Sequence, residues 1–313
     1  MPSVLITGGT GLVGKALTTQ LVNKGYEVII LTRNAKNKKA GHPNVTYAEW
    51  DVAAQKIDAA ALSKADHIIH LAGAGVADER WTEQRKQEIR DSRTQSSSLL
   101  LKGLAETPNK VETVVSASAI GWYGEDKKNN AYKHGFTEDA PPDKAFLGET
   151  CRLWEESIQP LEKLGKRLLI IRIGIVLSND GGAFLPFKKP VKFGIAAMLG
   201  NGKQIISWIH IDDLCRLFIH ALESKSMSGV YNAVAPHPVS NKNFTLALAA
   251  KLKGRFFVPI HVPAFLLKII LGEMSVEVLK SATVNGDKAR FAGFTFLYPD
   301  TQAAFSELCD PKK

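Results

Sequence analysis

The chain has 313 residues and a formal net charge of +9, and its 45% hydrophobic content is that of a folded globular protein. Its three cysteines and eight histidines form neither a CxxC nor an HExxH motif, so we expect neither a disulfide framework nor a bound metal ion. The positive charge is spread along the chain without a run of five or six basic residues, which argues against a nucleic-acid-binding protein.

The longest apolar stretches are too short and too often interrupted by charge to span a bilayer. The first predicted strand begins by Ser3, which leaves no room for a targeting segment. We therefore expect a soluble cytoplasmic protein without a membrane partner. The sequence leaves its oligomeric state open.

Short β-rich segments alternate with longer helical ones through the first two-thirds of the chain, a pattern typical of a parallel α/β sheet. The predicted strands are 3–8, 27–33, 45–51, 67–73, 113–119 and 167–177. After about Leu177, loops rich in glycine and proline precede apolar helices near 244–253 and 264–282. This order predicts a Rossmann-type doubly wound sheet over 1–178, to which 205–235 returns. A smaller C-terminal lobe, 179–313, would lie on the substrate side.

The segment ITGGTGLVG places Gly8, Gly11 and Gly14 between the first predicted strand and the first helix. A tight turn, a close approach to a pyrophosphate and a helix packed against a strand each favour glycine, and the helix N-terminus attracts the anion. The pattern predicts a dinucleotide-binding loop with contacts from Gly8, Thr10, Gly11, Leu12 and Val13.

The second predicted strand ends at Arg33, where an NAD-binding protein would usually carry an acidic residue for the ribose hydroxyls. A guanidinium suits a 2′-phosphate instead, so we expect NADP(H) in preference to NAD(H). Asp51 is placed to accept a hydrogen bond from the adenine amino group. The remaining expected cofactor contacts lie at the ends of the third and fourth strands and are Val52, Leu71, Ala72 and Gly73.

Together with SWIHIDDL at 207–214, these motifs resemble the extended short-chain dehydrogenase/reductase superfamily, which includes sugar-nucleotide epimerases and dehydratases. The segments at 236–245, 262–279 and 292–305 resemble the C-terminal part of an atypical branch known as epimerase family proteins. The resemblance covers nearly the whole chain and implies a Rossmann domain with a small C-terminal lobe. It implies an NADP-dependent oxidoreductase or epimerase-like enzyme, whose small substrate, anionic or a nucleotide sugar, it leaves open.

Superfamily members carry a catalytic tyrosine with a lysine four residues later, but the aligned helix, LGETCRLWEE, has Leu147 and Cys151 at these places. The resemblance puts Ser118 at the position of the substrate-orienting serine. Tyr123 is followed by a lysine four residues later, Lys127, which we interpret as a coincidence within a loop. Ser118 and Tyr123 are the predicted catalytic residues.

Substrate contacts are predicted for Arg93, one of two arginines at i, i+3 on a long helix, and for Trp122 and Trp208. Solvent exposure of the arginine and core packing of the tryptophans are the alternatives. The missing tyrosine and lysine also allow a second interpretation, a non-catalytic NADP-binding protein with a regulatory or redox-sensing role.

Overall fold

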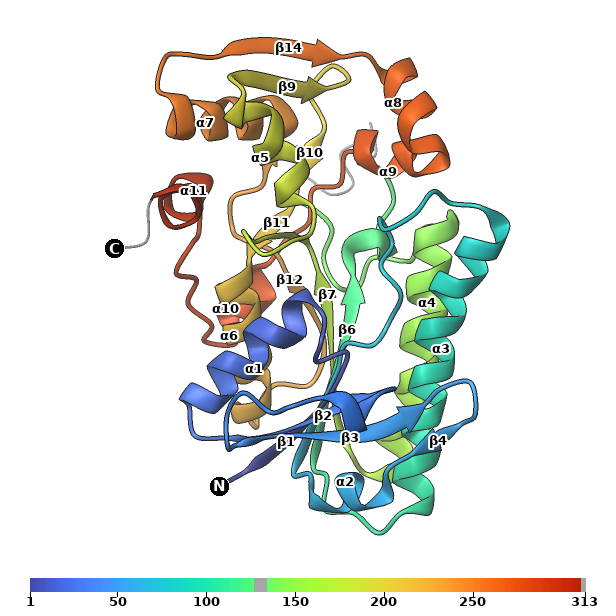
Figure 1. Ribbon diagram of the computed structural model, residues 1–313. Helices are drawn as coiled ribbons and strands as arrows, with labels where there is room; N and C mark the ends of the chain where they lie inside the picture. Colours follow the sequence, from blue (N-terminus) through green and yellow to red (C-terminus); the bar gives the residue numbers. More distant parts are fainter. Residues whose placement is uncertain (127–133, 311–313) are drawn as a thin grey trace.

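The computed structural model describes residues 1–126 and 134–310, and its centre is an eight-stranded sheet (Figure 1). The strand order is β12-β7-β6-β5-β1-β2-β3-β4, parallel throughout except for the pair β3 and β4. The strands are β1 (Ser3–Thr7), β2 (Glu27–Thr32), β3 (Val45–Asp51), β4 (Lys56–Ile57), β5 (His67–His70), β6 (Thr113–Ala119), β7 (Arg167–Ile173) and β12 (Gly229–Ala233). The predicted Rossmann-type parallel sheet is therefore confirmed. Its winding reverses between β1 and β5, where such sheets bind ligands.

Helices cover both faces of the sheet, which is why its central strands are apolar throughout. All five residues of β1 are buried, with Val4 and Ile6 on one face and Leu5 on the other. The first face is covered by α1 (Leu12–Asn23) and α6 (Ile211–Glu223), and the second by α2 (Ala59–Lys64), α3 (Glu83–Glu106) and α4 (Phe146–Ile158). These helices cover the faces of the sheet and not the carboxyl ends of its strands.

The predicted strand 167–177 is divided at Gly174, and β8 (Ile175–Leu177) leaves the main sheet to pair with β11 (Trp208–His210). The division falls at Gly174, where the backbone of Ser207 approaches closely. A Cβ at this position would lie 2.9 Å from the backbone oxygen of Ser207, so only glycine fits. Similarly, the predicted helix 264–282 is broken at Gly272, whose φ of +62° ends α8 (Ala264–Leu271). A short helix, α9 (Ser275–Leu279), follows.

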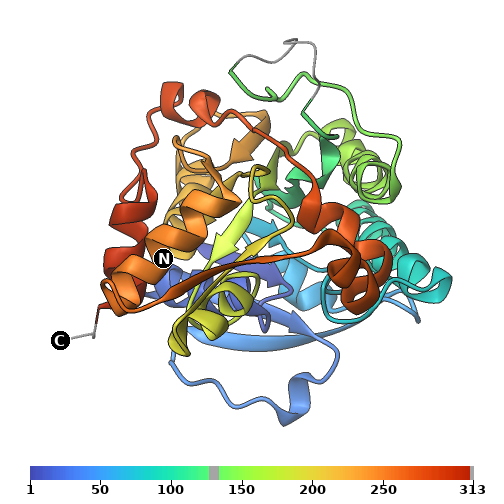
Figure 2. The same cartoon turned by 90° about the horizontal axis from the view of Figure 1, so that it is seen from above.

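The C-terminal segments above the carboxyl ends of the strands form a smaller layer (Figures 1 and 2). Its apolar core includes Phe184, Phe244 and Phe305, all at most 2% exposed. The intervening segment carries α6 and β12 back to the main sheet. The exact domain boundaries stay a prediction. The other elements are β9 (Ile195–Leu199), β10 (Ile205–Ile206), β13 (Val239–Ser240), β14 (Val258–Val262), α5 (Phe184–Lys192), α7 (Asn241–Lys253), α10 (Asp287–Phe291), α11 (Thr301–Cys309) and the 3₁₀ helices η1 (Ala35–Asn37), η2 (Ile120–Trp122), η3 (Gln159–Leu164) and η4 (Gly272–Met274).

Within the described residues, no helix combines the length and the apolar character needed to cross a bilayer. In the same part of the chain, no group of three or more histidine, cysteine, aspartate or glutamate side chains is placed to hold a metal ion.

Candidate functional site

The loop between β1 and α1 is closed so tightly that only glycine fits at its ends. Gly8 has a φ of +71°, and a Cβ there would lie 2.9 Å from the backbone carbonyl group of Leu71 at the end of β5. A Cβ on Gly14 would lie 2.5 Å from the Cα of Gly9. Gly11 caps α1 without a side chain, so the amides of the first helical turn receive no acceptor from a capping side chain. Thr10 and Gly11 are exposed beside these amides, and Leu12 and Val13 are partly buried.

This geometry fits a dinucleotide-binding site. The backbone is bare where a pyrophosphate must approach, and the N-terminus of α1 offers unpaired N–H groups to an anion. The loop lies beside β5 at the reversal point of the sheet. The residues present therefore fit a dinucleotide.

The residues predicted to bind the adenosine end lie after β2 and β3. Arg33 directly follows β2, is exposed and forms no ion pair with any described residue. Asp51 ends β3 and is exposed, and its Oδ1 accepts a hydrogen bond from the backbone N–H of Ala54 at 3.0 Å. Val52 beside it is partly buried.

A buried polar pair holds the end of β5 against the end of β1. Thr7 Oγ1 lies 2.7 Å from His70 Nδ1 and accepts hydrogen bonds from the backbone N–H groups of Leu71 and Ala72. Burial lowers the pKa of His70 to about 4, so the imidazole is neutral near pH 7. Leu71 is partly buried, Ala72 is buried and Gly73 is exposed. The Thr7–His70 pair thus fixes the backbone that faces the glycine loop.

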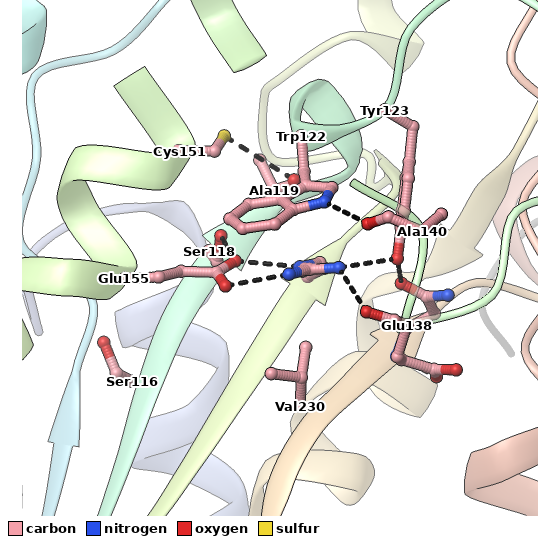
Figure 3. A network of polar contacts seen from close by, with 12 residues as sticks. Ser116, Ser118, Ala119, Trp122, Tyr123, Glu138, Ala140, Cys151, Glu155 and Val230 are labelled. Atoms are coloured by element: carbon pink, nitrogen blue, oxygen red, sulfur yellow. Dashed lines mark hydrogen bonds and ion pairs between the residues drawn. The ribbon is translucent and has the colours of Figure 1, made fainter. Parts of the chain in front are cut away.

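Ser118, a predicted catalytic residue, belongs to a polar network enclosed between β6, β7 and α4 (Figure 3). Its hydroxyl donates to Glu155 Oε1 at 2.6 Å, and the serine is 1% exposed. Glu155 in turn accepts from two nitrogens of Arg172, at 2.8 and 2.9 Å. Burial alone would lower the pKa of Arg172, but Glu155 outweighs it and the pKa is raised. The guanidinium therefore carries a permanent charge.

Tyr123, the other predicted catalytic residue, is fully buried at the opposite end of this network. Its hydroxyl donates to Asn232 Oδ1 at 2.7 Å and accepts from Arg172 Nη1 at 3.0 Å, and its ring stacks on Phe136. Burial raises the pKa of Tyr123 to about 12, so the phenol stays protonated near pH 7. Lys127, four residues later, lies outside the described residues.

The helix that should carry the superfamily's tyrosine and lysine is α4, and it contains neither residue type. Leu147 and Cys151 lie against η2, where a Cβ on Gly121 would be 3.1 Å from Leu147 Cβ and 3.6 Å from Cys151 Sγ. Burial raises the pKa of Cys151 to about 11, so the thiol is neutral near pH 7. Neither side chain replaces the missing proton relay.

The three predicted substrate residues are placed differently from one another. Trp122 is partly buried, donates to the carbonyl oxygen of Ala140 at 2.8 Å and has Arg172 3.6 Å above its ring. Trp208 is fully buried in the core of the C-terminal layer, so it presents no surface to a ligand as placed. Arg93 is partly buried and lies over Gly73, at the carboxyl end of β5. The structure thus brings Arg93, but not Trp208, to the predicted cofactor edge.

Sequence reasoning missed Arg172, Glu155 and Asn232, which join the two predicted catalytic residues. A signal was available, because Arg172 interrupts the apolar run that follows Arg167 in β7, RLLIIRI, and Glu155 lies on the buried face of α4. A charge within a buried strand requires a partner of opposite charge. The identity of that partner depends on how β7 and α4 pack, which the sequence pattern does not specify.

Together, the fold and the glycine loop define a Rossmann-type protein. Residues 4–145 match the NAD dependent epimerase/dehydratase family, and residues 262–308 match a domain of unknown function (DUF1731). Epimerase family protein SSP1921 of Staphylococcus saprophyticus is 36% identical over 98% of this chain and 99% of its own. Epimerase family protein YfhF of Bacillus subtilis is 35% identical over 99% of each chain. The chain therefore belongs to the epimerase family proteins, as its motifs predicted.

Solved structures agree with this assignment. Human epimerase family protein SDR39U1 (isoform 2), crystallised with NADPH, has a TM-score of 0.84 and 29% identity, covering 98% of this chain and 99% of its own. A nucleoside-diphosphate sugar epimerase from Corynebacterium glutamicum has a TM-score of 0.76 and 33% identity. It matches 99% of this chain over 58% of its own length.

Proposed function

We propose that this protein binds NADP(H) and acts as an oxidoreductase or epimerase-like enzyme on a small molecule. The observation that carries this proposal is the glycine loop, in which Gly8 and Gly14 pack too closely against the backbone of Leu71 and Gly9 for a Cβ, and which leaves the N-terminus of α1 without a side-chain cap. When bound, the nicotinamide would exchange a hydride with the substrate. The chain would bind both ligands and exclude water from the reaction.

The preference for NADP(H) over NAD(H) rests on the end of β2. Arg33 is exposed there, followed by Lys36 and by the pair Lys38 and Lys39, which are also exposed. A guanidinium can form a two-point, charge-assisted contact with a 2′-phosphate, and the nearby lysines add to the local positive field. The similarity to the human protein crystallised with NADPH supports the same choice.

The proton step is the least conventional part of the proposed reaction. Ser118 and Tyr123 are the proposed catalytic residues, and their hydroxyls are at opposite ends of one network through Glu155 and Arg172. With a pKa of about 12, Tyr123 is a poor base near pH 7, so in its proposed part it would donate a hydrogen bond, for which its hydroxyl proton would have to turn from Asn232 Oδ1 toward the substrate. A water molecule oriented by Ser118 would then give its proton to the substrate oxygen as the hydride reaches the neighbouring carbon, and would take it back in the reverse direction.

The second candidate function is a non-catalytic NADP-binding protein with a regulatory role. It is favoured by α4, which lacks both tyrosine and lysine, and by the burial of Ser118 and Tyr123 among partners within the protein. In this role the cofactor would act as a ligand that stabilises one state of the protein.

Turnover of the NADPH-loaded protein separates the two functions. Carbonyl compounds and nucleotide sugars are incubated with it, and oxidation of the nicotinamide and the products are followed by absorbance and mass spectrometry. The relationship to a nucleoside-diphosphate sugar epimerase is the reason to include nucleotide sugars. Product from any of these compounds supports an enzyme. Tight NADPH binding without product across the panel supports the regulator.

If turnover is found, Tyr123→Phe and Ser118→Ala test the proposed proton step. We expect each variant to lower kcat while NADPH affinity stays unchanged, because neither side chain belongs to the glycine loop. Unchanged kcat in both variants would remove these residues from the mechanism.

A further inference from the structure

Arg93 places a positive charge directly over the carboxyl end of β5. A Cβ on Gly73 would lie 3.1 Å from both Cγ and Cζ of Arg93, so the side chain crosses the backbone of this glycine. Its Cζ is 5.0 Å from the centre of the Trp154 ring on α4. Gly73 itself is exposed and follows the strand end that meets Gly8 of the cofactor loop. The guanidinium thus borders the predicted cofactor edge.

No described residue neutralises this charge. The guanidinium has one hydrogen bond to the described part of the chain, from Nη1 to the carbonyl oxygen of Ile89 at 2.7 Å, and no ion pair. Its titratable neighbours are Cys151, a neutral thiol, and Arg85, which carries the same charge. Arg85 is itself paired with Glu88 at 2.7 Å.

A partly buried cation in this setting loses hydration without gaining a counterion. Burial lowers the pKa of Arg93, which shows the direction of this cost. A guanidinium offers five N–H donors in a planar fork that matches a carboxylate or a phosphate. Most of these donors are unused here, so an anion at this place would recover the lost hydration and complete the fork.

We propose that Arg93 binds a carboxylate or phosphate group of the substrate, which makes the substrate class anionic. The assignment rests on the proposed function, because it places this anion next to the bound cofactor. The planar fork of Arg93 would hold the anion at a fixed distance from the carboxyl end of β5. The cation–π contact with the Trp154 ring would fix the position of the guanidinium. An anion of the cofactor itself is the other possible source of the same chemistry.

Calorimetric titration of the NADPH-loaded and cofactor-free protein with inorganic phosphate and with oxalate tests the site. We expect both probes to bind the loaded protein, and Arg93→Gln to weaken this binding about tenfold or more, as for loss of a charged hydrogen bond. Arg93→Lys should retain part of it. The matched control is Arg90→Gln, which removes a partly buried arginine from the same helix and should leave probe binding within about twofold of wild type.

Two results would overturn the assignment. If Arg93→Gln binds the probes as wild type does, the anion site lies elsewhere. If the probes bind only the cofactor-free protein and Arg93→Gln weakens NADPH itself, Arg93 holds an anion of the cofactor. The two proposals can be contradicted separately. Anion binding at Arg93 without turnover would contradict the enzymatic function and leave the anion site standing. Turnover of neutral substrates alone would contradict the anion site and leave the enzymatic function standing.

Discussion

Arg172 and Glu155 form a two-point ion pair inside the protein, with Nε–Oε1 and Nη2–Oε2 distances of 2.8 and 2.9 Å. Their side chains are 2% and 9% exposed. We expect Glu155→Gln to lower the free energy of unfolding by about 3–5 kcal/mol, because it leaves the Arg172 charge buried without a counterion. Urea denaturation near pH 7 measures this change.

The control for this variant is Glu156→Gln, one residue later on the same helix. Glu156 pairs with Arg152, and its side chain is 53% exposed. Its loss should cost less than about 1 kcal/mol, because exposed ion pairs contribute little. Equal losses of unfolding free energy in the two variants would show that the buried Arg172–Glu155 pair contributes no more to stability than an exposed pair.

Gly14→Ala should weaken NADPH binding about tenfold or more while the protein still folds. The added Cβ would lie 2.5 Å from the Cα of Gly9, so the loop must move away from the position in which it fits a pyrophosphate. Gly41→Ala is the matched control, because nothing lies within 4 Å of its added Cβ and its φ is not in the left-handed region. Fluorescence titration with NADPH measures both affinities. Full affinity in Gly14→Ala would contradict the role of the loop.

Because His70 is buried in its neutral form, we expect the free energy of unfolding to fall in mild acid. Its pKa is lowered from 6.5 to about 4 by burial, so between these values the unfolded chain binds a proton that the folded protein does not. The stabilisation is complete above about pH 6.5 and is lost as the pH falls toward 4, by up to about 3 kcal/mol. Urea denaturation at several pH values measures this slope.

In His70→Gln the slope over this interval should become shallower. His42→Gln should leave it unchanged, because His42 is exposed. An unchanged slope in His70→Gln would mean that other groups cause the acid sensitivity. Because folded His70 stays neutral over this interval, the Thr7–His70 contact to the backbone of Leu71 and Ala72 is kept, and we expect NADPH affinity to fall through His70 only as the pH approaches 4.

The fold was predictable because its main signals are local. Five of the six predicted strands coincide with β1, β2, β3, β5 and β6 to within a few residues, since each is a short apolar or β-branched run bounded by turns or helices. The sixth was drawn too long because Gly174 does not interrupt the hydrophobic pattern. Its reason for being glycine is the approach of Ser207, which is distant in the sequence.

The candidate site was predictable only in part, because some of its residues are defined by local spacing and others by contacts between distant segments. The glycine loop and Arg33 depend on spacing along one βαβ unit, so the sequence pattern specifies them. The partners of Ser118 and Tyr123 come from α4, β7 and β12, and no local pattern joins these elements. The position of Arg93 over Gly73 likewise depends on how α3 packs against the end of β5.

Arg33 is the residue through which the proposed cofactor choice is tested most directly. The measurement is the Kd of NADPH and of NADH for wild type, for Arg33→Asp and for Lys225→Asp, which makes the same charge change at an exposed site away from the cofactor edge. We predict that wild type and Lys225→Asp bind NADPH about tenfold or more tightly than NADH. Arg33→Asp should lose this preference through weaker NADPH binding, with NADH little changed. Equal Kd values for the two cofactors in wild type, or an equal loss of both in Arg33→Asp, would contradict the account.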